Sequence, residues 1–381
     1  MSNSQAPPQK PKNSTKQIIK LTLQIIAIIA IIAALLWYIG TTVPDSYKPD
    51  EPTIIKGIDF LLTTIRTMNI GYFLLAFLMY FGINIFFTVR LRRVLSKDGV
   101  KTSFGKTLLA QYAGMLTSDF TPGRSGYILT PIYLRDQNVP TTKSLSGILG
   151  IQTIEFLAKV AGGIGAIACL MYMVPMATWS EVFNHQEILG VNIGIVLAGL
   201  GIGVMFLGAI VLALFTWSKK AVTVFTRIAT WRFLKRFTGG LIGKLEEYKE
   251  SAHSTQRAIP EIVALTLICW VLKGLEWYFL GLALGITNIP LIVYFLIHPL
   301  VTALAFIPIL PAGIGVQEFG IIGILGLLGV PLATAGVFAI IARLLLILQD
   351  LIGVPQIVKS TSLIFSHKKT QEPPITSHEV S

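Results

Sequence analysis

The sequence predicts an all-α polytopic membrane protein with about eight apolar segments, six of them full spans and two of them hairpins broken by proline and glycine. Composition is the first reason, because 53% of the 381 residues are apolar and only 13% are charged. That is about half the charged fraction of a typical soluble domain. The second reason is that the apolar residues form long blocks and do not alternate with polar ones. These blocks exclude a soluble enzyme, a disordered tail protein and an outer-membrane barrel.

Six apolar blocks are long enough to span a bilayer, and they lie at residues 18–39, 71–89, 145–174, 188–217, 262–284 and 331–358. The first block has Trp37 and Tyr38 at its far end, where an aromatic belt belongs, and it lacks the cleavage site of a secretory signal. We therefore expect one transmembrane domain over residues 18–358. Around and within it we expect polar disordered tails at 1–17 and 359–381, a polar loop at 40–69 and a charged amphipathic insert at 218–258.

Two further apolar segments are interrupted by proline and glycine. The first is broken at residues 118–126 and the second at residues 308–315. At 1.5 Å per residue, the arms of the first hairpin are too short to cross about 30 Å of hydrocarbon. The arms of the second hairpin are longer, so a full crossing stays open there.

The distribution of Lys and Arg predicts the orientation of the chain. Most of the 31 basic residues lie in the two tails, in the tract 90–106 and in the tract 219–257. Positively charged flanks face the cytoplasm, so we expect a multi-pass plasma-membrane protein with both termini cytoplasmic. Beside membrane spans, the basic tracts are better interpreted as flanks attracted to anionic lipid headgroups than as a nucleic-acid-binding surface.

The two broken segments predict an internal repeat. The break that begins at Pro122 is followed 18 residues later by Pro140, and the break at Pro311 is followed 20 residues later by Pro331. Each of these prolines follows a valine, and each Val-Pro pair predicts the start of a long helical span. Because the two hairpins would be entered from opposite sides, the units would be inverted, as in many secondary transporters. The alternative is that glycine and proline are simply frequent in membrane helices.

Ionisable residues inside the apolar blocks are the candidate functional residues. Each is costly in contact with lipid, so each must face the protein interior or a wet cavity. Glu155 with Lys159, and Lys273 with Glu276, have helical spacing and can form purely structural ion pairs. The full set is Asp119, Arg124, Glu155, Lys159, Lys273, Glu276, Glu318, Arg343 and Asp350.

Arg124 is the sharpest of these candidates. It lies between Gly123 and Gly126 in a turn where the backbone can approach a ligand closely, and the next helix would begin there with unpaired N–H groups. A guanidinium in that place suits a phosphate. The alternative is that Arg124 only binds freed carbonyls or pairs with Asp119. In the second hairpin, Glu318 follows Gly315 by three residues and is a candidate counter-charge or proton carrier.

The sequence contains no motif of a cofactor, metal or catalytic site. There is no HExxH pattern and no Walker A loop. The two cysteines, Cys169 and Cys269, lie inside apolar runs, where a disulfide framework has no use. We therefore expect no cofactor, no metal and no catalytic residue, and the chain is more readily interpreted as a transporter than as an enzyme.

The stretches Pro122-Gly-Arg-Ser-Gly126 and Pro311-Ala-Gly-Ile-Gly-Val-Gln-Glu318, together with Glu155 and Arg343, resemble the motifs of the flippase-like family. It is also called the lysylphosphatidylglycerol synthase transmembrane-region family and includes stand-alone, UPF0104-like prokaryotic members. The resemblance covers roughly residues 18–358. It implies a helical domain that moves a phospholipid or a polyprenyl-linked lipid between leaflets, with Arg124, Glu155, Glu318 and Arg343 as motif residues.

The chain departs from the family pattern at four positions. An acidic residue is usual at Tyr127 and four residues after Glu155, where Lys159 stands, while glycine is usual at Ala312 and arginine at Gln317. These changes alter the charge of the site and leave the particular lipid open. The short tail after residue 358 leads us to expect no aminoacyl-transferase domain.

Three functions remain open from the sequence. The first is a lipid translocator in which two inverted hairpins form a midplane site for a headgroup phosphate. The second is a membrane enzyme that acts on a lipid-phosphate carrier, such as a glycosyl- or phospho-transferase. The third is a partner scaffold, and homo-oligomer formation is compatible with any of them.

Overall fold

The computed structural model describes residues 29–44, 46–121, 125–183, 185–188, 190–218, 255–306 and 315–360. Nearly all of these residues are helical, which confirms the predicted all-α polytopic membrane fold. The described helices are Ile29–Thr42, α2 (Thr53–Thr67), α3 (Ile70–Lys97), α4 (Phe104–Asp119), α5 (Thr130–Tyr133), α6 (Thr141–Met173), α7 (Met176–Val182), α8 (Ile193–Trp217), α12 (Ile259–Ala283), α13 (Leu291–Ala305), α14 (Val316–Leu327) and α15 (Leu332–Asp350). The short 3-10 turns are η1 (Ser125–Leu129), η2 (Arg135–Gln137) and η4 (Leu351–Gly353), and one two-stranded hairpin pairs β1 (Glu187–Ile188) with β2 (Val191–Asn192).

Five of the described helices are long and apolar enough to cross a membrane. They are Ile70–Lys97, Thr141–Met173, Ile193–Leu214, Ile259–Ala283 and Leu332–Ser360, and they coincide with five of the six apolar blocks from which spans were predicted. The sixth predicted span, 18–39, is described from residue 29 onward. The tail 1–17, residues 361–381 and nearly all of the insert 218–258 lie outside the described residues.

Prolines start both of the helices that the repeat pattern singled out. Pro140 is the N-cap of α6 and Pro331 is the N-cap of α15, so each helix begins at the residue after its Val-Pro pair. Proline lacks a backbone N–H group, but at a helix start this loses no hydrogen bond, because the first N–H groups of a helix have no partner within it. The predicted helix starts are therefore confirmed.

Both broken hairpins have short arms. In the first, α4 has 16 residues, and the returning chain is divided into η1, α5 and η2. In the second, α13 has 15 residues and α14 has 12. At 1.5 Å per residue these arms measure about 24, 22 and 18 Å, less than the roughly 30 Å of a hydrocarbon core. The described helices of the second hairpin are thus each shorter than a full crossing, while the break between them at 307–314 lies outside the described residues.

The segment 40–69 is not the polar loop that its composition predicts. Residues Thr53–Thr67 form α2, whose apolar side packs on the bundle through Phe60, Leu61 and Ile65. Asp59 of α2 fixes the loop before the helix. It accepts a hydrogen bond from Tyr47 Oη at 2.5 Å and forms an ion pair with Lys48 Nζ at 2.7 Å. Helical periodicity inside a polar stretch was the signal that the composition hid.

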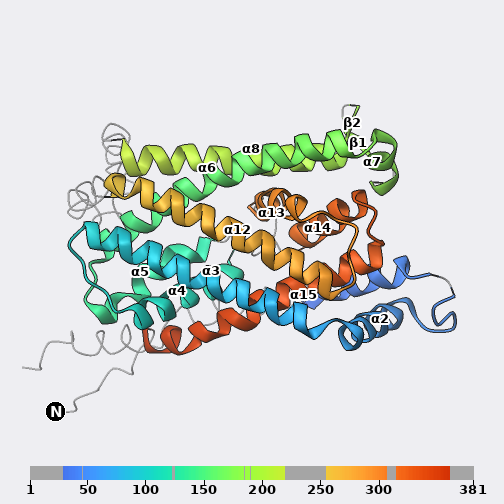
Figure 1. Cartoon of the computed structure of the whole chain (residues 1–381), viewed down its shortest axis with the longest axis horizontal. Helices are drawn as coiled ribbons and strands as arrows, with labels where there is room; N and C mark the ends of the chain where they lie inside the picture. The colour runs from blue at the N-terminus through green and yellow to red at the C-terminus, as the bar shows by residue number, and fades with distance from the viewer. Residues whose placement is uncertain are drawn as a thin grey trace, which may run out of the picture.

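The long helices run along the long axis of the molecule, and the two hairpins lie in opposite halves of it (Figure 1). Helices α3 and α12 are antiparallel neighbours. Near one end Asn69 N–H donates to the Ala283 carbonyl, and near the other Lys97 Nζ lies 2.8 Å from Glu261 Oε1. Two apolar clusters make up most of the core. The larger joins helix Ile29–Thr42, α3, α6, α8 and α12 to α15, and the smaller joins the end of α3 to α4, η1 and the starts of α6 and α12.

Candidate functional site

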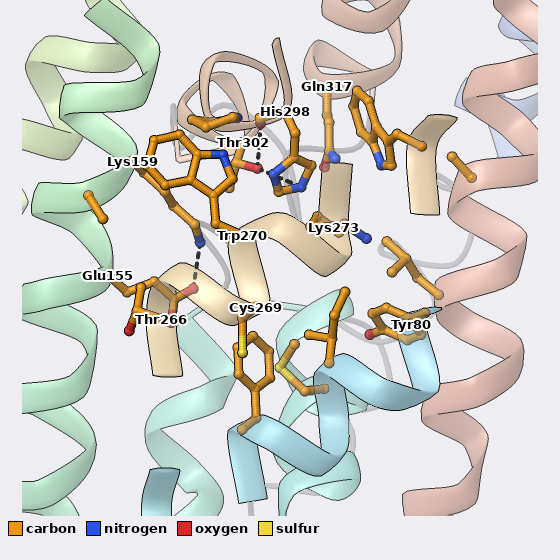
Figure 2. A pocket seen from close by; sticks show the side chains of 18 of the residues that line it. Tyr80, Glu155, Lys159, Thr266, Cys269, Trp270, Lys273, His298, Thr302 and Gln317 are labelled. Atoms are coloured by element: carbon orange, nitrogen blue, oxygen red, sulfur yellow. Dashed lines mark hydrogen bonds and ion pairs between the residues drawn. The ribbon is translucent and has the colours of Figure 1, made fainter. Parts of the chain in front are cut away.

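A cavity of about 110 Å³ lies between α3, α6 and α12 to α15. The two apolar clusters of the core meet here, since Phe87, which packs on the larger cluster, and Met115, which packs on the smaller, both line the cavity. The lining also gathers four cations, two carboxylates and one imidazole: Arg90, Lys159, Lys273, Arg343, Glu155, Glu318 and His298. Charged side chains from five helices thus line one space inside an apolar bundle, and Figure 2 shows three of them, Glu155, Lys159 and Lys273.

The first charged group is the Glu155 cluster, formed by Arg90, Glu155 and Lys159. Lys159 Nζ donates to Glu155 Oε1 at 2.6 Å, one turn along α6. Arg90 of α3 donates through Nη2 to Glu155 Oε2 at 2.9 Å and through Nη1 to Thr266 Oγ1 of α12 at 2.8 Å. The guanidinium also lies 4.6 Å from the centroid of the Phe87 ring. One carboxylate therefore serves two cations.

Arg90 corrects the sequence interpretation of the tract 90–106. The basic tract predicts that Arg90 belongs to a cytoplasmic flank at the end of a span, but the exposed fraction of Arg90 is only 1%. The reason is that α3 continues to Lys97, so Arg90 lies two turns inside the helix. Tyr80, Ile83, Phe87 and Arg90 all line the cavity, and their spacing of three, four and three residues places them on one helix face. That spacing was the available signal.

The second charged group is the Glu318 cluster, formed by Glu318, Arg343, Gln317 and Gly315. Arg343 of α15 donates to Glu318 Oε1 at 2.6 Å through Nε and to Gln317 Oε1 at 3.0 Å through Nη2. The other carboxylate oxygen of Glu318 accepts from Gly315 N–H at 2.6 Å. Gly315 has φ of 89°, a left-handed conformation that favours glycine. The cluster ties α15 to the first turn of α14, next to the break of the second hairpin.

Two more polar contacts lie beside the cavity. Lys273 Nζ donates to both oxygens of Glu276 at 2.7 Å, and Glu276 is fully buried. Tyr80 donates to Asp350 at 3.0 Å, and Lys273 Nζ lies 4.8 Å from the centroid of the Tyr80 ring. Lys273 therefore reaches the cavity with its charge already balanced by Glu276.

An aromatic and polar wall faces the charged groups (Figure 2). His298 of α13 meets Trp277 edge to face, with ring centroids 5.0 Å apart, and its Nε2 lies 3.3 Å from Thr302 Oγ1. Trp270 donates from Nε1 to the Phe295 carbonyl at 2.6 Å. His298 therefore lines the cavity while its ring stays close to Thr302, one turn further along α13.

The structure brings part of the predicted site together. Glu155, Glu318 and Arg343 all line the cavity, although they come from α6, α14 and α15. Gly123 and Arg124 lie outside the described residues, so their predicted roles stay predictions. The remaining predicted site residues, Asp119, Gly126 and Gly315, do not belong to the cavity lining.

The four residues assigned to structural ion pairs fall into two groups. Lys159 and Lys273 pair within their own helices as predicted, with Glu155 and Glu276, but both also line the cavity. Glu276 and Asp350 are fully buried, and neither is in the lining. A lysine can thus form an ion pair within its own helix and line the cavity at the same time.

Several lining residues were not predicted as site residues. All of them are uncharged except Arg90, which was predicted to lie in a cytoplasmic flank. They include Arg90, Tyr80, Thr266, Cys269, Trp270, Trp277, Thr302 and Gln317. Only their convergence in space distinguishes them from other core residues. Within the described ranges, no group of three or more His, Cys, Asp or Glu side chains is arranged to hold a metal ion.

The amino-acid sequence of the chain is similar to that of known membrane proteins. The sequence profile of a family described as the lysylphosphatidylglycerol synthase TM region matches residues 25–353. One curated relative is the UPF0104 membrane protein PH1989 of Pyrococcus horikoshii, which is 24% identical over 329 residues. The match covers 81% of this chain and 93% of the relative. The matched region contains every helix that contributes to the cavity.

Proposed function

Because the chain belongs to the lysylphosphatidylglycerol synthase transmembrane-region family, we propose that it moves a phosphate-bearing lipid between the leaflets of the plasma membrane. One observation carries the proposal: four cations and two carboxylates line a single cavity inside an apolar helical bundle. Charges inside a membrane protein are expensive and mark pathways or binding sites. A polar site at this depth is what a lipid headgroup needs in order to cross hydrocarbon.

The size of the cavity supports movement of a headgroup with the acyl chains left in the bilayer. Pockets that enclose a whole small ligand have volumes of roughly 300–1,000 Å³. The cavity has about 110 Å³, so it accommodates a headgroup and not a complete lipid. The outward faces of the long helices carry exposed apolar side chains, such as Leu78, Leu207 and Leu348, which suit contact with acyl chains.

The helix contacts support an inverted repeat. One unit comprises α3, α4, α5 and α6, and the other comprises α12, α13, α14 and α15. In this comparison α3 corresponds to α12, α4 to α13, α5 to α14 and α6 to α15. The helix contacts of one unit then recur in the other: α13 packs on α6 as α4 packs on α15, and α5 packs on α6 as α14 packs on α15. The leading helices α3 and α12 are antiparallel. In inverted-repeat transporters, rocking of one unit against the other exposes a central site to each side in turn.

The orientation that we propose puts both termini in the cytoplasm. Lys97, Lys106 and Lys143 belong to the end of the bundle where α3 ends and α4 and α6 begin. Basic residues at one end of the spans favour the cytoplasmic side and anionic headgroups there. The first hairpin would then be entered from the cytoplasm, with Arg124 near its tip available to receive a phosphate.

A transport assay tests the proposed function. Full-length protein is reconstituted in phosphatidylcholine vesicles that contain fluorescent phosphatidylglycerol, and loss of outer-leaflet fluorescence to dithionite reports exchange between leaflets. We expect fast exchange with the wild type, and slow exchange with empty vesicles and with the Glu318→Gln/Arg343→Gln double variant, which removes both charges together. Exchange at the rate of empty vesicles with the wild type would contradict translocation. Recovery of chemically altered lipid would favour the membrane-enzyme alternative.

The Arg124→Ala variant tests the sequence prediction for the first hairpin in the same assay. We expect it to abolish exchange while the protein keeps its elution volume and its thermal unfolding midpoint. Undiminished exchange would remove Arg124 from the pathway and leave the cavity as the site. A matched control is Lys97→Gln, because Lys97 pairs with Glu261 at 2.8 Å on the surface, with side chains that are 40% and 37% exposed.

A further inference from the structure

We propose that the Glu155 cluster is the subsite for the anionic phosphate of the lipid, and that Lys159 determines the preference for an anionic over a zwitterionic headgroup. This inference rests on the proposed function and assigns the ligand to one wall of the cavity, formed by α3, α6 and α12. Figure 2 shows Lys159 and Glu155 on this wall, on the other side of the cavity from His298 of α13 and Gln317 of α14.

The charge balance of the Glu155 cluster is the first argument. Among the described residues, Glu155 is the only carboxylate within ion-pair distance of Arg90 or Lys159. Both of its oxygens are used, one by each cation. The group therefore carries one surplus positive charge, with side chains that are only 2%, 12% and 19% exposed for Arg90, Glu155 and Lys159. A surplus charge so far from water attracts an anion strongly.

Open hydrogen-bond donors are the second argument. Arg90 uses Nη1 and Nη2, while its buried Nε has no hydrogen-bond partner in the described part of the chain. Lys159 Nζ has three donors and uses one of them for Glu155. Since buried donors are normally satisfied, the cluster has both the charge and the hydrogen-bonding capacity for a phosphate oxygen.

The other charged groups of the cavity are balanced. Glu318 faces one cation, Arg343, and its second oxygen accepts from Gly315 N–H. Lys273 binds both oxygens of the buried Glu276. Arg343 Nη1 also lacks a hydrogen-bond partner within the described residues, so it can donate to a ligand, but its charge is already neutralised. The surplus lies at Lys159 and Arg90.

Cys269 offers a direct probe of this wall. It lines the cavity beside Arg90 and Thr266, and Cys169 is the only other cysteine of the chain. In a Cys169→Ser background, the rate at which N-ethylmaleimide alkylates Cys269 reports whether the wall is occupied. Full-length protein is measured in nanodiscs of phosphatidylcholine alone, with added phosphatidylglycerol, or with free inorganic phosphate in the buffer.

We expect phosphatidylglycerol to slow the alkylation of Cys269 and free phosphate to have little effect. The Lys159→Gln variant should weaken this protection about tenfold, the effect of losing one charge-assisted hydrogen bond. Lys159→Arg should retain the protection. Glu155→Gln should strengthen it, because this change raises the surplus charge. A purely structural role would predict that Lys159→Gln and Glu155→Gln act in the same direction.

The outcomes separate this inference from the proposed function. Equal protection in wild type and a folded Lys159→Gln variant, with lipid exchange intact, would overturn the subsite and leave translocation standing. Protection by free phosphate alone would overturn the lipid assignment. Absence of exchange in the wild type would contradict the proposed function whatever the alkylation rates are.

Discussion

Replacing Arg343 with glutamine removes the only cation that contacts Glu318 in the described structure. Glu318 is left nearly buried, since its side chain is 3% exposed and that of Arg343 is 12% exposed. Removing one partner of a buried pair costs roughly 3–5 kcal/mol, because the remaining charge stays without compensation. Glu318 retains the hydrogen bond from Gly315 N–H, so we expect a loss near the lower limit, about 3 kcal/mol.

The double variant Glu318→Gln/Arg343→Gln provides the internal comparison. Two amides of similar size can hydrogen-bond to each other and leave no buried charge, so we expect a loss of about 1 kcal/mol or less. The double variant should therefore be about 2 kcal/mol more stable than Arg343→Gln alone. The surface pair control, Lys97→Gln, should change stability by less than about 1 kcal/mol, because both side chains of the Lys97–Glu261 pair are more than a third exposed.

Reversible unfolding by sodium dodecyl sulfate in mixed micelles measures these differences in free energy. The expected order of stability is wild type, then the double variant, then Arg343→Gln. If Arg343→Gln alone is as stable as wild type, the Glu318 cluster is open to water and the reasoning from burial is wrong. If the double variant is no better than the single variant, the loss comes from packing of the arginine stem.

Three further outcomes follow from particular contacts. A Cβ on Gly126 would lie 2.4 Å from the Thr117 carbonyl oxygen, so Gly126→Ala should cost roughly 1–3 kcal/mol in the same unfolding assay. The control is Gly199→Ala, which should not destabilise the protein because nothing lies within 4 Å of the added atom. Lys48 and Tyr47 lower the pKa of Asp59 below its ordinary value of 3.8. Stability from this contact is therefore present above that pH and lost as the pH falls through the lowered pKa. The protection factors of the α2 amides, taken relative to the intrinsic exchange rate at each pH, should stay high at pH 5 and fall only in stronger acid. Arg90→Gln leaves Glu155 with Lys159 alone and neutralises the cluster, so phosphatidylglycerol should no longer slow Cys269 alkylation; protection equal to wild type would contradict the shared-carboxylate argument.

Much of the fold could be predicted from the order of residues along the chain. Long apolar blocks predict helices because each backbone group in hydrocarbon must be bonded within its own segment, and five of the expected spans are present. Val-Pro pairs predicted the starts of α6 and α15 for a local steric reason. The amphipathic helix α2 was missed because a polar composition hides a narrow apolar face.

Part of the candidate site also followed from sequence, since Glu155, Glu318 and Arg343 were singled out as charges that lipid excludes. Their partners could not be deduced in the same way. Arg90 contacts Glu155 across 65 positions of the chain, and Arg343 contacts Glu318 across 25. Such pairings depend on how helices pack, and local spacing carries no information about them.

By itself, the sequence determined that this chain is a bundle of membrane helices, where its helices are broken, and which charges inside the apolar blocks are excluded from lipid. Those properties depend on transfer free energies and on backbone geometry, which act residue by residue. Tertiary structure alone decided that the buried charges meet in one cavity and that one carboxylate serves two cations there. Charge balance is a property of groups brought together in space, so it became visible only when α3, α6 and α12 were packed against one another.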